Sequence, residues 1–176
     1  MWNVIRNITV LFILVTVLLA GCGLQSEKEV IKETEDAAKQ AFLSEEKIEL
    51  NKTIDDLSFY LPDDLTVKEA NKTNVILKKD DQTYIVFYNN LEDSSSKLNY
   101  KSASQQEEAL LMESFTEQGK FGYIRVDASK EEKYELQIGI GGVKITTYTE
   151  KASMVEDSKN LMKIARSIVE SNKEIK

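Results

Sequence analysis

The chain has 176 residues with 30 acidic and 23 basic side chains, a formal net charge of −7, one cysteine and no histidine. A single cysteine excludes a disulfide within the chain, and the lack of histidine excludes catalytic triads and metal sites built on imidazole. An acidic surface repels phosphate groups, so we expect no nucleic-acid partner. The length suits one domain with a leader segment.

Residues 1–21 have the layout of a secretory signal. An apolar run from Ile8 to Leu19 follows the basic residue Arg6 and precedes the small residues Ala20 and Gly21. The run is shorter than the roughly 20 apolar residues that a membrane-spanning helix needs. We therefore predict a signal peptide at residues 1–21 in preference to a permanent transmembrane helix.

The stretch Leu19-Ala20-Gly21-Cys22 resembles the lipobox of bacterial lipoproteins. The resemblance implies that the sulfur of Cys22 carries a diacylglyceryl group, that the signal is removed, and that Cys22 begins the mature protein. It also implies a lipid anchor in the cell membrane, with the protein on the extracytoplasmic side; two acyl chains hold a protein stably. The alternative is an ordinary signal followed by an incidental cysteine.

Residues 22–52 are interpreted as the lipidated cysteine and a charged, partly helical spacer. Apolar residues separated by three, four and seven positions predict a helix from about Glu27 to Leu43 with one narrow apolar stripe. The stripe consists largely of alanine, which buries little area. A solvated spacer is therefore favoured over a helix that docks on a partner or on the domain itself.

Residues 53–172 are expected to form a single domain that begins with strands. Alternating apolar residues predict a strand over 57–61 that ends at Pro62. The β-rich runs 74–78 and 83–88 are separated by a short polar stretch, which predicts a hairpin.

The middle of this domain has a different pattern. Residues 89–102 are polar and rich in serine, which predicts a long loop. We expect the domain to fold even when residues 92–97 of this loop are deleted. Ser104 and Glu107 have the spacing of a capping box, and Gly119 is a suitable helix end. We therefore predict a helix between Ser104 and Gly119.

The last third of the chain predicts a strand over 121–126, a tight hairpin over 134–149 and a helix from Ser153 to about Glu170. A two-residue turn at Gly141-Gly142 would pair Ile140 with Val143, Ile138 with Ile145 and Leu136 with Thr147. The helix would carry a wide apolar face made of Leu161, Met162, Ile164, Ala165, Ile168 and Val169. The expected fold class is α+β, a largely antiparallel sheet covered by amphipathic helices.

Three stretches carry a resemblance to a known fold: LSFYLPDD (57–64), IGIGGVKIT (138–146) and LMKIARSIVES (161–171). On these residues the chain resembles, from Thr53 to Ser171, the PsbP-like fold of a photosystem II extrinsic protein and of LpqN-type bacterial lipoproteins. Leu65 stands where that family usually places an aromatic residue after the opening proline. The resemblance implies an accessory or binding protein.

No residue pattern points to catalysis, a cofactor or a metal ion. The glycines at 139, 141 and 142 precede a strand, so they do not form a phosphate-binding loop. Three acidic pairs, Asp55-Asp56, Asp63-Asp64 and Asp80-Asp81, have side chains suited to acid-base chemistry or calcium binding. Aspartates are also common in turns, and this is the favoured interpretation.

Tyrosines are the candidate contact residues, because a tyrosine combines an apolar ring with a hydrogen-bonding tip. The interaction surface that we predict comprises the loop from Asn89 to Tyr100 with Tyr60, Tyr88, Tyr100, Tyr123 and Tyr148. The favoured alternative is that they line the second face of the sheet beneath a helix.

The sequence therefore predicts a non-enzymatic, membrane-anchored lipoprotein. Its partners would be the membrane, through Cys22, and an unidentified extracytoplasmic protein. One alternative is a receptor that holds a small ligand between sheet and helix. Another is a hydrolase that uses carboxylates alone.

Overall fold

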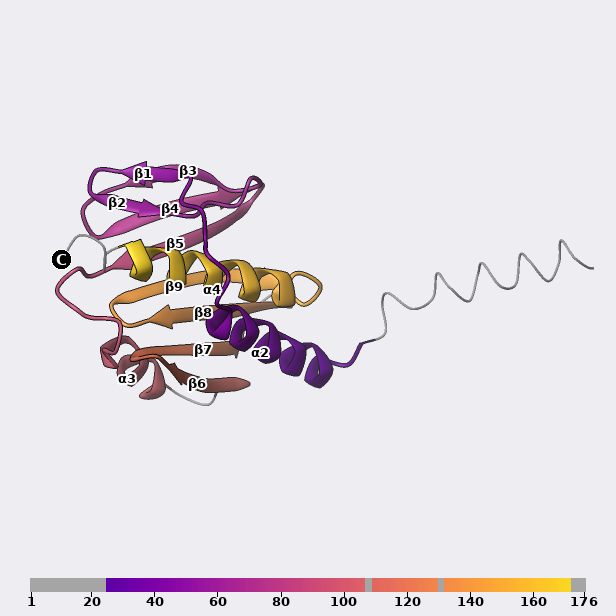
Figure 1. Ribbon diagram of the computed structural model, residues 1–176. Coiled ribbons are helices and arrows are strands. Elements are labelled where there is room, and N and C mark those ends of the chain that lie inside the picture. Colours follow the sequence, from indigo (N-terminus) through magenta and orange to yellow (C-terminus); the bar gives the residue numbers. More distant parts are fainter. Residues whose placement is uncertain (1–24, 107–108, 130–131, 172–176) are drawn as a thin grey trace, which may run out of the picture.

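The computed structural model describes residues 25–106, 109–129 and 132–171. These residues form an α+β fold with a largely antiparallel sheet, as the sequence predicts (Figure 1). The seven strands of the main sheet lie in the order β3-β4-β5-β9-β8-β7-β6, and every neighbouring pair is antiparallel. Their bounds are β3 Thr66–Ala70, β4 Asn74–Lys79, β5 Gln82–Tyr88, β6 Leu111–Glu117, β7 Lys120–Ala128, β8 Lys133–Ile140 and β9 Val143–Glu150.

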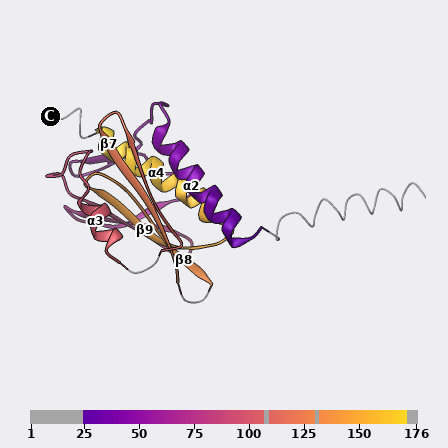
Figure 2. The same cartoon turned by 90° about the horizontal axis from the view of Figure 1, so that it is seen from below.

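The helices cover the two faces of this sheet unequally. The long helices α2 (Glu27–Leu43) and α4 (Met154–Ser171) lie on one face, and the short helix α3 (Leu98–Ser104) lies on the other (Figure 2). A separate two-stranded sheet, β1 (Lys52–Ile54) with β2 (Leu57–Phe59), packs on α4. The predicted opening strand is therefore half of this small hairpin, and β3 was not predicted.

Both predicted hairpins of the main sheet are confirmed. Ile140 pairs with Val143, Ile138 with Ile145 and Leu136 with Thr147. Gly141 has φ +54°, the left-handed conformation that a two-residue hairpin turn requires. In the β4–β5 hairpin Asp80 takes the equivalent conformation, with φ +48°. Local turn chemistry and alternation therefore set these registers.

The predicted helix between Ser104 and Gly119 is wrong. Residues 98–104 form α3 inside the predicted loop, and Leu111–Glu117 form the edge strand β6, paired with β7. Gln118 and Gly119 both have positive φ, 47° and 74°, so they form the hairpin turn between the two strands. Gly119 has the left-handed conformation that we expected at a helix end, but it lies in the turn that follows β6.

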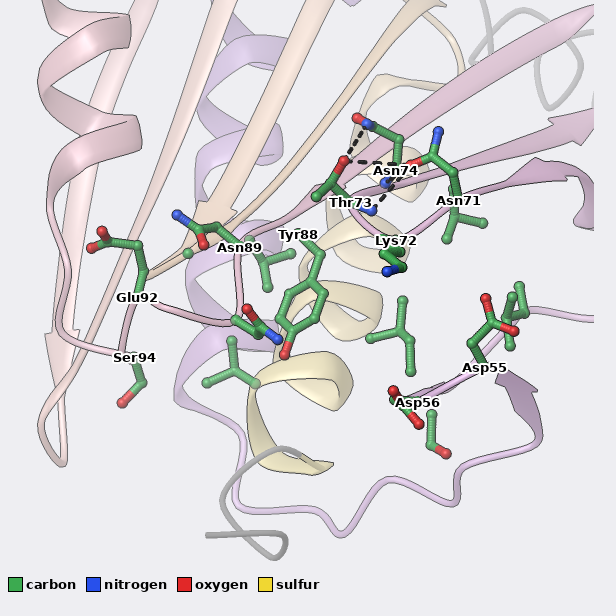
Figure 3. A pocket seen from close by; sticks show the side chains of 18 of the residues that line it. Asp55, Asp56, Asn71, Lys72, Thr73, Asn74, Tyr88, Asn89, Glu92 and Ser94 are labelled. Carbon is green, nitrogen blue, oxygen red and sulfur yellow. Dashed lines mark hydrogen bonds between the residues drawn. The ribbon is translucent and has the colours of Figure 1, made fainter.

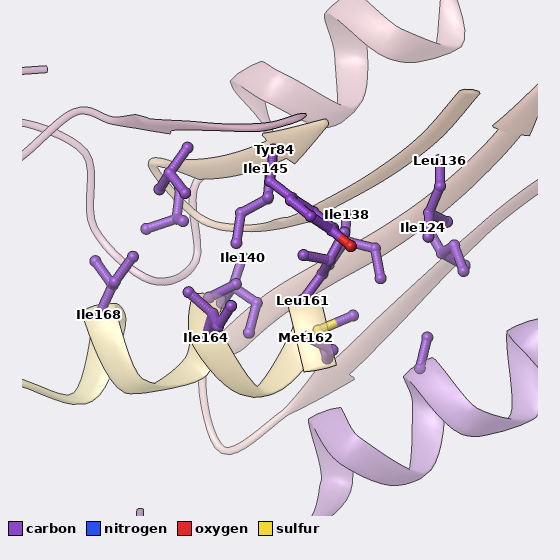
Figure 4. Close-up of a cluster of buried hydrophobic side chains, with 14 of the residues drawn as sticks. Tyr84, Ile124, Leu136, Ile138, Ile140, Ile145, Leu161, Met162, Ile164 and Ile168 are labelled. Carbon is purple, nitrogen blue, oxygen red and sulfur yellow. The ribbon is translucent and has the colours of Figure 1, made fainter. Parts of the chain in front are cut away.

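The core lies between the sheet and α4. Isoleucines of β8 and β9 meet the apolar face of α4, and all six residues predicted for that face are buried (Figure 4). Fully burying a side chain such as Leu161 or Ile164 stabilises the fold by about 1.5–3 kcal/mol. The closing helix is thus confirmed as the main cover of the sheet.

Helix α2 is confirmed in its bounds but is not a free spacer. Val30, Thr34, Ala38 and Phe42 are buried, and the helix packs on α4, β6 and β7. The buried guanidinium of Arg166 in α4 donates hydrogen bonds to backbone carbonyls at the carboxyl end of α2. The alternative that the sequence left open, a helix docked on its own domain, is what the structure has.

Candidate functional site

A cleft of about 1380 Å³ opens at the end of the main sheet where β5 and β8 finish (Figure 3). Four connections line it: the β1–β2 turn, the β3–β4 turn, the loop after β5 and the β8–β9 turn. Val169, near the carboxyl end of α4, also lines it. The cleft therefore gathers segments that are far apart in the sequence.

The loop wall of the cleft rests on the two glycines of the β8–β9 turn. Asn89 N–H donates to the carbonyl of Gly142 at 3.1 Å, and Phe121 N–H donates to that of Ser94 at 2.8 Å. A Cβ added at Gly141 would lie 2.3 Å from the Asp93 carbonyl oxygen, and one at Gly142 would lie 2.4 Å from that of Asn89. Glycine is thus needed here for close packing. That deletion of residues 92–97 leaves the domain folded stays a prediction; such a deletion would remove the contacts that Asp93 and Ser94 make here.

A second wall is the β3–β4 turn. The Asn71 side-chain oxygen accepts the N–H groups of Thr73 and Asn74, both at 3.0 Å. The Thr73 carbonyl accepts the N–H of Tyr88 at 2.8 Å, which ties the turn to the end of β5. Asparagine side chains commonly close turns in this way. These two hydrogen bonds fix the side-chain amide group of Asn71 at the cleft.

The β1–β2 turn supplies the opposing wall. Asp55 has φ +48°, a conformation that aspartate tolerates in tight turns, and both Asp55 and Asp56 are exposed. Figure 3 shows these carboxylates on one side of the cleft and Glu92 on the other, with Tyr88 between them. Partial burial raises the pKa of the Tyr88 hydroxyl. The Tyr88 hydroxyl therefore stays protonated at neutral pH and can donate a hydrogen bond.

The structure disperses the five tyrosines predicted as a contact surface. Among the described residues, one pair of these five rings is in contact: Tyr100 of α3 and Tyr123 of β7, with centroids 5.9 Å apart. Tyr123 is buried, as the second-face alternative requires, whereas Tyr88 lines the cleft. Tyr60 lies beside α4 beneath a lysine ammonium group, and Tyr148 is 53% exposed on β9.

The other acidic pairs lie in turns at the opposite end of the sheet or beside it. Asp64 forms an ion pair with Lys79 at 2.6 Å, while Asp80 and Asp81 line a second cavity of about 520 Å³. This cavity reaches Asp157, a buried carboxylate that the sequence analysis missed.

Asp157 accepts hydrogen bonds from Gln82, Tyr84 and Thr149 at 2.9, 3.0 and 2.5 Å. In this network the buried carboxylate has hydrogen-bond donors for both of its oxygens, and the bonds join β5, β9 and α4. The role of Asp157 is therefore structural. No local pattern marks the network, because two of its three donors, Gln82 and Tyr84, come from β5, which is more than 70 residues away in the sequence.

Within residues 25–106, 109–129 and 132–171, no group of three or more Cys, Asp or Glu side chains is placed to hold a metal ion. No helix in this part of the chain is long and apolar enough to cross a membrane. Cys22 and the predicted signal peptide lie outside the described residues.

Comparison of the chain with protein-family models, with curated proteins and with solved structures finds no match.

Proposed function

We propose that this protein is a lipid-anchored, non-enzymatic binding protein on the extracytoplasmic face of a bacterial cell membrane, and that its cleft is the binding site. The observation that carries the binding site is the cleft itself, about 1380 Å³ in volume with both apolar and hydrogen-bonding walls. Ligand pockets combine these features. The lipid anchor rests on the sequence Leu19-Ala20-Gly21-Cys22 and on the apolar run before it.

The position of α2 fits this arrangement. Its first turn lies at the end of the sheet opposite the cleft, where Glu27 accepts a hydrogen bond from Tyr134 at 2.7 Å and Gln25 accepts one from Lys151 at 3.1 Å. Strand β9 runs from this end to Val143 at the cleft, a length of about 24 Å at 3.4 Å per residue. A lipid on Cys22 would thus hold the cleft away from the bilayer.

Photo-crosslinking in intact cells tests the binding site. A benzophenone amino acid at Asn90, an exposed lining residue, should form an adduct, whereas the same group at Ser114 on β6, away from the cleft, should not. Equal adducts from the two positions, or none from Asn90, would contradict a binding role for the cleft.

A docking surface for another protein is the second candidate function. Leu91 is 88% exposed and Leu98 is 58% exposed, both within the Asn89–Tyr100 segment. Protein contact sites are exposed patches of apolar side chains, and in this second function Leu91 of the loop and Leu98, the first residue of α3, would supply the apolar side chains of the contact. Adducts from a crosslinker at Leu98 but not at Asn90 would favour this function.

We also propose that the fold is PsbP-like. The support is the resemblance over 57–64, 138–146 and 161–171, the last two of which form the central hairpin and the closing helix.

A further inference from the structure

The cleft carries more negative than positive charge. Asp55 and Asp56 stand on one wall and Glu92 on another, and none of the three forms an ion pair with a described residue. Lys72 is the one basic residue among those that line the cleft within the described part of the chain. Carboxylates on facing walls repel an anionic occupant and attract a cationic one.

The cleft also has an apolar part. The half-buried Ile54 and Leu57 flank the acidic turn, and the buried Val75, Val143 and Val169 form the floor toward the sheet and α4. Aliphatic side chains of this size suit aliphatic side chains of an occupant. They do not satisfy the hydroxyl groups of a saccharide, which would be desolvated without partners.

Hydrogen-bond donors complete the lining. The side-chain Nδ2 groups of Asn71 and Asn89 and the hydroxyl of Tyr88 donate to no atom of the described residues. Donors of this kind suit the backbone carbonyls of a peptide in an extended conformation. The volume also exceeds the roughly 300–1,000 Å³ of an ordinary small-molecule pocket, so there is room for several residues.

We propose that the occupant of the cleft is an extended, positively charged peptide segment. Its Lys or Arg side chains would meet Asp55, Asp56 and Glu92, and its aliphatic side chains would meet the half-buried Ile54 and Leu57. This inference rests on the proposed function, because it takes the cleft to be the binding site.

Fluorescence anisotropy on the full-length chain in neutral detergent tests the proposal. The probe is a short labelled peptide of lysine, valine and serine; the comparison probes are the same peptide with glutamate for lysine, and a labelled chitin oligosaccharide. The test variant is D55N/D56N/E92Q, in which asparagine at 55 keeps the positive φ without strain. The matched control, D63N/E113Q/E117Q, removes as many exposed charges from residues that do not line the cleft.

We expect the lysine peptide to bind and the glutamate peptide not to bind. The cleft variant should bind the lysine peptide about tenfold more weakly, as three partly exposed charge pairs predict, and the control should not change. Binding should weaken between about 0.1 M and about 1 M salt, where the Debye length falls from about 10 Å to about 3 Å.

Equal binding of both peptides, tighter binding of the oligosaccharide, or no loss in the cleft variant would overturn the inference. So would a failure of the lysine peptide to bind at all. The photo-crosslinking experiment separates these results from failure of the proposed function: an Asn90 adduct with no lysine-peptide binding means that the cleft takes a different occupant.

Discussion

Arg166 offers the sharpest test of how α2 is held on the domain. Its side chain is 2% exposed, and its two terminal nitrogens donate to the carbonyls of Ala41, Ser44 and Glu46, where α2 ends. Replacing Arg166 by alanine leaves three carbonyls at a helix end without these donors. Each hydrogen bond from a charged group contributes about 1.5–3 kcal/mol, and the bonds share one side chain, so R166A should lose about 4 kcal/mol.

For a chain of this size that loss lowers the melting temperature by about 12 °C, at about 3 °C per kcal/mol. Circular dichroism during heating measures it. The control is E170Q, because Glu170 is 39% exposed and its oxygen lies 3.6 Å from Arg166 Nε; this variant should stay within about 1 kcal/mol of the wild type. If R166A has the same melting temperature as the wild-type protein, these hydrogen bonds do not hold α2 on α4.

The remaining predictions concern the cleft wall and the buried network. In urea denaturation, G141A should lose about 2–4 kcal/mol, from the positive φ and from the contact with the Asp93 carbonyl. G119A, where the added Cβ meets nothing within 4 Å, should lose only about 1 kcal/mol, and equal losses would refute the close packing at Gly141. D157A should lose at least about 3 kcal/mol, because three donors lose their acceptor, and a smaller loss would mean that the network is not satisfied in solution. Burial, and next the charge of Asp157, raise the pKa of Tyr84 above its ordinary value of 10.0. Its protonated form therefore stabilises the fold fully below pH 10, and the stability measured in denaturant should fall above pH 10. Y84F should fall less steeply there, and an identical alkaline profile would show that Tyr84 does not contribute.

Elements set by neighbours in the sequence were predictable. The Gly141-Gly142 hairpin depends on a two-residue turn and on alternation beside it, and the closing helix depends on a wide apolar face. The helix bounds Glu27–Leu43 also follow from periodicity alone.

Elements that depend on pairing between distant parts of the chain could not be predicted. Residues 111–117 alternate weakly, and only their pairing with β7 and the turn at Gln118-Gly119 make them a strand. The capping-box spacing at Ser104 instead misled the prediction.

The docking of α2 likewise depends on contacts that span more than a hundred positions, such as Arg166 to Ala41 and Ser158 to Thr34. A narrow stripe of alanine did not reveal them.

The cleft could not be predicted for the same reason. Its residues stand in turns, where the acidic pair Asp55-Asp56 looks like any exposed turn. Only the tertiary structure places this pair across from Glu92 and Tyr88.

Mass spectrometry of the protein extracted from membranes tests the lipid anchor, on which its position outside the cell depends. We predict a chain that begins at Cys22 and carries a diacylglyceryl group on that sulfur, and we expect C22A to leave the membrane fraction. A chain that still begins at Met1, or an unmodified Cys22 in a membrane-bound protein, would contradict the proposed anchor.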